Sequence, residues 1–326
     1  MSHGAGGFGI RFSTDSVPER ERLPFFRESL GRSIMRLDLG PYDDSRPLRY
    51  AAVVHEFDGV CVMSAQTNGH ICRRTQPLLT DGHDEFILST NLSGFSLPSQ
   101  AGRKFRMDAG PAVLLSGSDV GARDCPVPGE SLTLRIPRRL LDGMAAKPED
   151  ALARPIPAST EALRLLVDYI QLVLKKRGPA PPELRRLFAA HISDLVALAV
   201  GATRDGADIA HSRGMRAARL HAAKAFIARH SGRPGLSVSN VAAHLGITPR
   251  YVHTLFAAEG ASLTTFIINE RLDRAHRMLT DPRMVERTIS MIAFAAGFSD
   301  LSHFNRTYRR RFGETPSETR HDSIGI

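Results

Sequence analysis

The chain has 326 residues, three cysteines and a formal net charge of +9 at pH 7, and this length is enough for two domains that each bury a core. It contains no run of about eighteen apolar residues, which excludes a transmembrane helix, and its first residues lack the apolar core of an export signal. Cys61, Cys72 and Cys125 cannot all pair, which fits a reducing cytoplasm.

The N-terminal half predicts short β-strands. The runs RYAAVVHEF (49–57) and VCVMSA (60–65) flank Asp58-Gly59, and two β-rich runs around Asp-Gly are typical of a hairpin. Further apolar runs, each bounded by Gly, Pro or Ser, follow at 85–99, 112–117 and 131–137. Many short strands at this spacing favour an antiparallel barrel or sandwich, and we assign it to residues 1–156.

Two amphipathic helices follow, in residues 157–202. The first has an apolar stripe at helical spacing, formed by Leu163, Leu166, Val167, Ile170 and Leu174. A Pro/Gly-rich turn separates it from a second helix that closes at Gly201. We expect a helical hairpin whose stripes form a dimer contact; the alternative is that both stripes pack on the barrel. Residues 203–212 are polar and non-periodic, as in a linker.

Nearly all of the excess positive charge lies in the last third of the chain. Residues 213–326 hold 17 Lys and Arg against 9 Asp and Glu, a net charge of +8. Such asymmetry predicts a polyanion as the partner of this segment alone, although a basic, soluble surface without a partner gives the same count.

An internal repeat organises this basic segment. In each copy an alanine precedes a glycine by four residues, at Ala242 and Gly246 and again at Ala293 and Gly297. Each glycine follows a short helix and precedes a longer, capped one: Thr248 with Pro249 marks the first start, and Ser299 or Asp300 the second. Short helix, glycine turn and second helix form a helix-turn-helix; one copy alone could equally be an ordinary helical hairpin.

The second helix of each copy has a buried stripe and an outward face. The predicted stripes are Val252, Leu255 and Phe256, and Leu301, Phe304 and Tyr308. The predicted outward side chains are Arg250, His253 and Thr254 in the first copy, and Ser302, Arg306, Arg309 and Arg310, with His303 beside them, in the second. Polar side chains near a helix start can meet base edges, whereas later arginines meet phosphate. The alternative for any one of them is a solvated surface residue.

Residues 213–320 resemble the DNA-binding domain of AraC/XylS-type transcription regulators. The motif that carries the resemblance is TISMIAFAAGFSDLSHFNRTYRRRFGETPSETR, with Tyr308 where Phe is usual and Thr319 where an aromatic residue is common. The resemblance implies two recognition helices in successive major grooves. The positions that match the family's base-contacting residues are Arg250, His253, Thr254, Leu301, Ser302, His303 and Arg306.

The front half resembles the cupin-like N-terminal domain of one branch of the same family. The similarity spans residues 73–117 and 132–141, with Gly110-Pro111 where the family often has Gly-Asp. It implies small-molecule sensing or dimerisation. We therefore expect an α+β protein of two domains that acts as a ligand-responsive activator, with promoter DNA, RNA polymerase, an effector and a second copy as partners.

Two functions from other classes stay open. A metal-dependent cupin enzyme would need clustered imidazoles and carboxylates, for which the candidates are His70, Cys72, His83 and Glu85, without a His-x-His motif. An architectural DNA protein would use its front half only to dimerise. We expect no catalytic residue, metal or cofactor.

Overall fold

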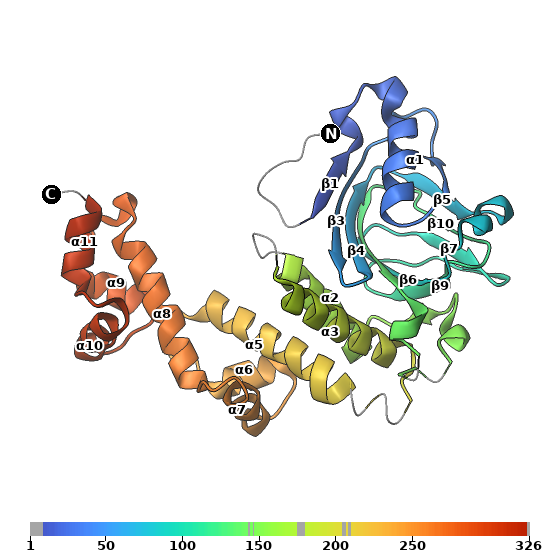
Figure 1. Ribbon diagram of the computed structural model, residues 1–326. Helices are drawn as coiled ribbons and strands as arrows, with labels where there is room; N and C mark the ends of the chain where they lie inside the picture. Colours follow the sequence, from blue (N-terminus) through green and yellow to red (C-terminus); the bar gives the residue numbers. More distant parts are fainter. Residues whose placement is uncertain are drawn as a thin grey trace. The chain divides into compact units, whose positions relative to one another are not determined.

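The computed structural model describes residues 9–142, 144–145, 147–174, 180–203, 207 and 210–324. The chain folds as two compact units, an N-terminal unit, Met1–Ala218, and a C-terminal unit, Arg219–Ile326. Both are drawn in Figure 1. Half of the stretch expected to be a linker, residues 204–206 and 208–209, lies outside the described residues, as does the basic end of the first predicted helix, 175–177.

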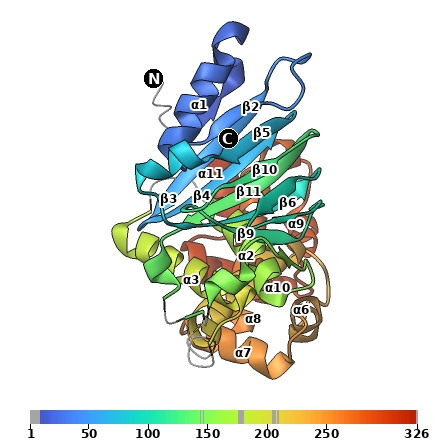
Figure 2. The same ribbon diagram turned by 90° about the vertical axis from the view of Figure 1, so that its right-hand side faces the viewer.

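The N-terminal unit contains two antiparallel sheets. The larger has the order β1-β3-β4-β11-β6-β9-β12, and the smaller β2-β5-β10-β7-β8. Figure 2 shows their strands fanned side by side, with helix α1 (Arg22–Ser33) beside β2. The strands are β1 Ile10–Ser13, β2 Asp38–Pro41, β3 Tyr50–Phe57, β4 Val60–Thr67, β5 His70–Arg74, β6 Phe86–Ser93, β7 Leu97–Gln100, β8 Arg103–Lys104, β9 Ala112–Ser116, β10 Gly121–Asp124, β11 Gly129–Ile136 and β12 Pro155–Ile156.

The predicted hairpin at Asp58-Gly59 is confirmed. Phe57 pairs with Val60 across the turn, and β3 and β4 continue in register to Tyr50 and Thr67. Both turn residues have positive φ, 46° for Asp58 and 90° for Gly59. Two consecutive positive φ values give the turn the twist of the strands that it joins, and Asp-Gly adopts them at low cost.

Successive side chains of a strand point to opposite faces of a sheet. In the larger sheet, side chains on both faces are buried. On β4, Val60 and Val62 belong to the core shared with the helical hairpin. Cys61 and Met63 of the same strand belong to a second core, which also contains α1 side chains such as Phe26. One sheet therefore separates two hydrophobic cores.

The two helices after the barrel are α2 (Glu161–Leu174) and α3 (Pro182–Val200). Their apolar stripe lies against the larger sheet: Leu163, Leu166 and Ile170 are buried in the same core as Phe57 and Val60. These stripe side chains are therefore buried by contacts within a single chain. A dimer contact through this hairpin would use its outward side chains, among which Leu187 is 45% exposed.

The C-terminal unit is helical in its described residues and has two small cores. One gathers side chains of α5 to α8, and the other gathers side chains of α8 to α10 together with Phe298. Helix α8 contributes to both and so joins two halves of similar design (Figure 1). The helices are α5 Arg216–His230, α6 Val238–Leu245, α7 Pro249–Ala257, α8 Leu263–Leu279, α9 Ile289–Ala295, α10 Leu301–Phe312 and α11 Pro316–Ile324. None of the described helices combines the length and apolar content needed to cross a bilayer.

Candidate nucleic-acid interface

The first helix-turn-helix consists of α6 and α7. Ser237 caps α6 with a reciprocal pair of hydrogen bonds to Asn240, and Gly246 ends the helix in the left-handed conformation at φ 65°. Thr248 then caps α7 by accepting a hydrogen bond from the backbone N–H of Tyr251, and Pro249 occupies the first helical position. The predicted glycine turn and helix start are both confirmed.

The second helix-turn-helix consists of α9 and α10. Gly297, at φ 103°, lies so close to the Ser231 carbonyl oxygen that a Cβ would approach it to 2.4 Å. The carboxylate of Asp300 accepts a hydrogen bond of 3.0 Å from the backbone N–H of His303. Of the two predicted caps, Ser299 and Asp300, the structure therefore selects Asp300. The same bond holds the pKa of Asp300 below its usual range, so the cap is ionised at neutral pH.

Helix α7 presents three predicted DNA-contacting residues on its surface. Arg250, His253 and Thr254 are exposed, whereas the predicted stripe of Val252, Leu255 and Phe256 is buried. The Thr254 hydroxyl donates to the Arg250 carbonyl oxygen at 3.2 Å, which leaves its oxygen free to accept. Within the described residues, the Arg250 guanidinium makes no hydrogen bond or ion pair to another side chain.

On α10, one stripe assignment is wrong. Phe304 and Tyr308 are fully buried, but Leu301 is 37% exposed and lies outside the core. Phe298, from the turn before the helix, takes the expected place, with its ring centroid 5.0 Å from that of Phe304. Leu301 thus stands on the surface of the first helical turn beside Ser302, which is compatible with its family role.

The three consecutive arginines of α10 differ in their contacts. Arg309 and Arg310 are exposed, as is Arg306 one turn earlier. Arg311 instead donates to both carboxylate oxygens of Asp273 on α8, at 2.7 and 2.9 Å. Arg311 therefore holds α10 against α8, a role that the charge pattern alone does not show. Arg309 and Arg310 remain available to a partner.

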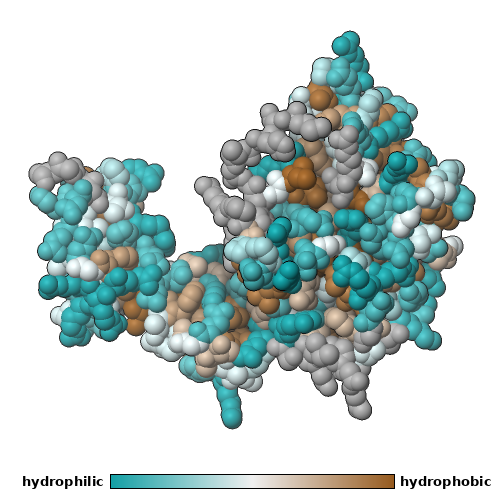
Figure 3. All heavy atoms as spheres, in the orientation of Figure 1, coloured by the Kyte–Doolittle hydropathy of each residue, from teal (hydrophilic) through white to brown (hydrophobic). Residues whose placement is uncertain are grey.

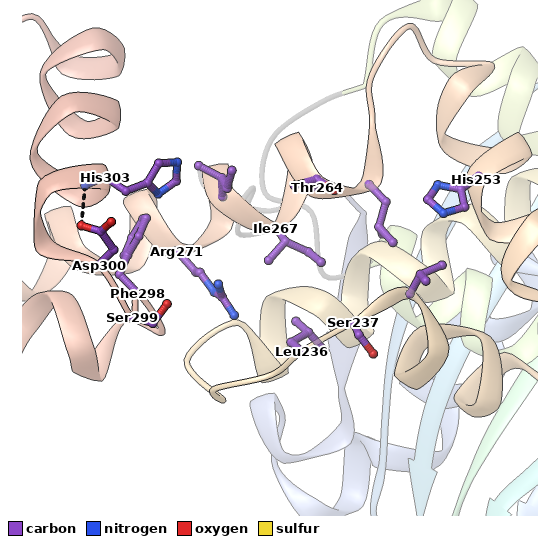
Figure 4. A pocket seen from close by; sticks show the side chains of 13 residues that line it. Leu236, Ser237, His253, Thr264, Ile267, Arg271, Phe298, Ser299, Asp300 and His303 are labelled. Atoms are coloured by element: carbon purple, nitrogen blue, oxygen red, sulfur yellow. Dashed lines mark hydrogen bonds between the residues drawn. The ribbon is translucent and has the colours of Figure 1, made fainter.

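A cleft of about 360 Å³ lies between the two halves, along α8. Figure 4 shows His253 of α7 at one end and His303 of α10 at the other, with Arg271 of α8 between them. Arg271 donates to the carbonyl oxygens of Ser231 and Arg233, at 3.0 and 3.3 Å, and so holds the end of α5. His303 is only partly exposed and packs near the Phe298 ring. No local sequence pattern indicates this cleft, because it depends on how α8 spaces the halves.

The visible face of the C-terminal unit is mostly hydrophilic (Figure 3). The exposed basic side chains of α7 and α10 lie in the part of the chain that carries a net charge of +8. A basic, hydrophilic surface with exposed arginines on two helices suits the polyanionic backbone and the major grooves of duplex DNA.

The metal-ligand candidates do not come together as a set. His83 makes a hydrogen bond of 3.0 Å with Glu85, while His70 is buried and bonded to the Thr67 hydroxyl at 3.1 Å. Across the ranges that the structure describes, no three His, Cys, Asp or Glu side chains gather as ligands for a metal ion.

Two capped helix-turn-helix motifs in one helical unit, joined to a β-barrel unit, define a DNA-binding transcription regulator of two domains. Family models match both parts: a helix-turn-helix domain over residues 241–322 and an AraC-binding-like domain over residues 26–200. The second match spans more than half of the sequence, and the chain belongs to the AraC family of transcription regulators.

Similar proteins include two activators. Transcriptional activator NphR of Rhodococcus sp is 25% identical over 275 residues, which cover 83% of this chain and 80% of that protein. Transcriptional activator RhrA of Rhizobium meliloti (strain 1021) is 29% identical over 167 residues, and here the chain spans about half of the relative, 51%. The crystal structure of the AraC-like transcriptional activator CuxR covers 82% of this chain and 95% of that chain, at 20% identity and a TM-score of 0.48.

Proposed function

We propose that this regulator recognises a specific promoter sequence by placing α7 and α10 in successive major grooves. The observation that carries the proposal is the pair of capped helices whose outward arginines, Arg250 and Arg306, make no ion pair within the described residues. A guanidinium that is exposed and free of a carboxylate can form two directional bonds with guanine.

The proposed contacts divide by their position on each helix. The base-reading set is Arg250, His253, Thr254, Leu301, Ser302, His303 and Arg306, all within the first two turns of their helices. Arg309 and Arg310 follow about one turn later, and we assign them to phosphate. Base contacts give sequence preference, and phosphate contacts give affinity that depends on salt.

The N-terminal unit is proposed to regulate this binding. An effector in the barrel would change promoter occupancy only by binding two states of the protein with different affinity. The protein would act in the cytoplasm as a homodimer and an activator that contacts RNA polymerase, in line with the activator names of its relatives. No observation on the described residues favours a metal-dependent enzyme or a purely architectural protein.

The test is selection of bound duplexes from a random-sequence pool by the full-length protein, followed by sequencing. We expect one consensus with two half-sites about one helical turn apart. Arg250→Ala should relax the preference at one or two base pairs of one half-site, and Arg306→Ala at one or two base pairs of the other. A protein that binds all sequences equally would instead be architectural, and one that binds no duplex would refute the proposal.

A further inference from the structure

A buried guanidinium without a counter-ion lies inside the barrel. Arg123, on strand β10 of the smaller sheet, is only 8% exposed and lines a cavity of about 80 Å³. Its Nη2–H donates to Asn91 Oδ1 at 2.5 Å, and its Nη1–H donates to Cys125 Sγ at 3.6 Å. Its Nε is buried and has no hydrogen-bond partner.

Asn91 is held in place to meet this charge but cannot neutralise it. Its amide nitrogen donates to the Ser96 hydroxyl at 3.0 Å and to the Met107 carbonyl oxygen at 2.8 Å, which leaves Oδ1 directed at Arg123. An amide oxygen supplies a dipole rather than a full negative charge. A buried charge that lacks an opposite charge costs several kcal/mol.

The acidic side chain next along the strand points elsewhere. Asp124 follows Arg123 on β10, so the two side chains face opposite sides of the sheet. Asp124 pairs with Arg73 at 3.2 Å and accepts from the backbone N–H of Cys72. Among the residues that the structure describes, no carboxylate forms an ion pair with Arg123.

The titratable neighbours of Arg123 are neutral at physiological pH. Burial and, to a smaller extent, the nearby Arg123 charge lower the pKa of His70 to about 3. Burial raises the pKa of the Cys72 thiol to about 12 and raises the pKa values of Cys125 and Tyr50 as well. No thiolate, phenolate or carboxylate of the described residues therefore compensates the guanidinium.

A second arginine of the same cavity shows what compensation looks like here. Arg74 is 5% exposed, and its two terminal nitrogens donate to the two carboxylate oxygens of Asp81, at 2.7 and 2.5 Å. Its Nε–H donates to the Gly117 carbonyl oxygen at 3.0 Å. Every nitrogen of Arg74 thus has a partner within the chain, whereas Arg123 has a free donor and an unmatched charge.

The cavity is small, and both apolar and polar side chains line it. Its apolar lining includes Leu30, Ile34 and Met35, from α1 and the segment after it, and its polar lining includes Ser89 and Thr133. Its volume gives room for roughly five to eight water-sized groups. A site with one uncompensated charge and an apolar part of its wall suits a ligand that is charged at one end and apolar at the other.

We infer that the barrel binds a small monocarboxylate, whose carboxylate accepts hydrogen bonds from Arg123 and whose apolar end lies against the side chains of α1. This inference rests on the proposed effector-sensing function, and it specifies the chemical class of the effector. The carboxylate would complete the coordination of Arg123 in the way that Asp81 completes that of Arg74.

The experiment compares matched acids and amides on the full-length protein. Thermal unfolding and titration calorimetry are measured with butyrate and valerate, and with butyramide and valeramide, at constant ionic strength. We expect the acids to raise Tm and to bind at least about tenfold more tightly than the amides, because only the acids supply a charge-assisted pair. Equal responses to acids and amides, or no response to any of the four, would overturn the inference.

Variants locate the effect. Arg123→Met should lose the preference for acids, and without ligand it should be at least as stable as the wild type, because it removes an uncompensated charge. The matched control is Arg73→Met, which removes a partly exposed arginine on the adjacent strand and should retain the acid response. A folded Arg123→Met that binds the acids with wild-type affinity would contradict us. If Arg123→Met does not fold, Arg123 is needed for folding of the barrel, and the comparison of acids with amides on the wild type still tests the inference.

DNA binding is measured on the same preparations. A protein that binds DNA but does not prefer acids would contradict this inference alone, whereas a protein that binds no DNA would contradict the proposed function.

Discussion

The hydroxyl of Tyr308 donates a hydrogen bond of 3.0 Å to Oγ1 of Thr319. These are the two positions at which the sequence departs from the motif of its family, and they contact each other across α10 and α11. The Tyr308 oxygen also lies 2.8 Å from Nδ1 of His276 on α8, and the Thr319 hydroxyl donates to Glu314 at 2.6 Å. A chain of polar contacts thus holds the final helix against α10 and α8.

Tyr308→Phe should lower the free energy of unfolding of the C-terminal unit by about 1–3 kcal/mol, because the buried groups of His276 and Thr319 lose a partner. Thr319→Val should have a smaller effect, and the double variant should cost less than the sum of the two. Urea unfolding of all three variants measures this coupling. Strict additivity would show that the bond contributes nothing to stability.

Much of the DNA-binding fold could be predicted because its signals are local. The turn glycines, the cap at Thr248 and the spacing of Phe304 and Tyr308 lie within one or two helical turns of the structure that they specify. The placement of Leu301 and the ion pair of Arg311 could not be predicted. Both depend on packing against distant segments; Asp273 is 38 residues from Arg311.

The barrel site could not be predicted for a related reason. Arg123 belongs to the ordinary run GARDC, and a charged residue in a strand is usually on its solvent face. Only the closure of two sheets places its side chain inside, while Asp124 meets Arg73 on the opposite face. A prediction of the site would have required the register of β10 against β5 and β7.

Gly297→Ala should be far more damaging than Gly246→Ala, although both glycines end the first helix of a helix-turn-helix with positive φ. A Cβ at Gly246 meets nothing within 4 Å, so that variant bears only the conformational cost of about 1–2 kcal/mol. A Cβ at Gly297 would approach the Ser231 oxygen to 2.4 Å. Circular dichroism melts and DNA titrations should show a folded, binding Gly246→Ala and a disrupted Gly297→Ala. Equal stability of the two variants would contradict the turn geometry.

Acid should destabilise the N-terminal unit through His70. Its pKa falls from 6.5 to about 3 on folding, so its contribution to stability is complete above pH 6.5 and is lost as the pH falls toward 3. Each pH unit below 6.5 should cost up to about 1.4 kcal/mol. Buried His55, whose pKa is lowered to about 4, acts in the same direction. His70→Gln should therefore reduce the slope of stability between pH 7 and 5 without abolishing it; an unchanged slope would mean that His70 is protonated in the folded barrel.

A fragment of residues 213–326 should fold and bind duplex DNA by itself. It contains both cores of the C-terminal unit and 17 Lys and Arg residues. The fragment lacks Asp194, so the described ion pair between Arg213 and Asp194 is lost. Fluorescence anisotropy should show affinity that falls steeply as salt rises, because neutralised phosphates release counter-ions. Residues 1–212 serve as the control and should not bind. A salt-insensitive complex would show that the basic surface is not the contact.

Arg306 and Arg310 should contribute differently although both lie on the outward face of α10. Arg306 is in the second turn of a helix that begins at Leu301, where a side chain reaches base edges, and Arg310 is about one turn farther along. A guanidinium on guanine typically gives about 1–3 kcal/mol of discrimination, whereas one on phosphate gives affinity without sequence information.

Arg306→Ala should therefore weaken binding and relax the preference at one or two base pairs, at one end of the site only. Arg310→Ala should weaken binding to all sequences alike and reduce the salt slope by about one phosphate contact. Neither variant should unfold the protein, because both side chains are exposed while Phe304 and Tyr308 are buried. Each variant is titrated against a library of single-base-pair changes at two salt concentrations.

Arg311→Ala is the structural control, because it removes the ion pair with Asp273 and should lower the stability of the protein more than its sequence preference. If Arg306→Ala lowers affinity uniformly and keeps its sequence preference, Arg306 binds phosphate, and base reading by this face of α10 is refuted.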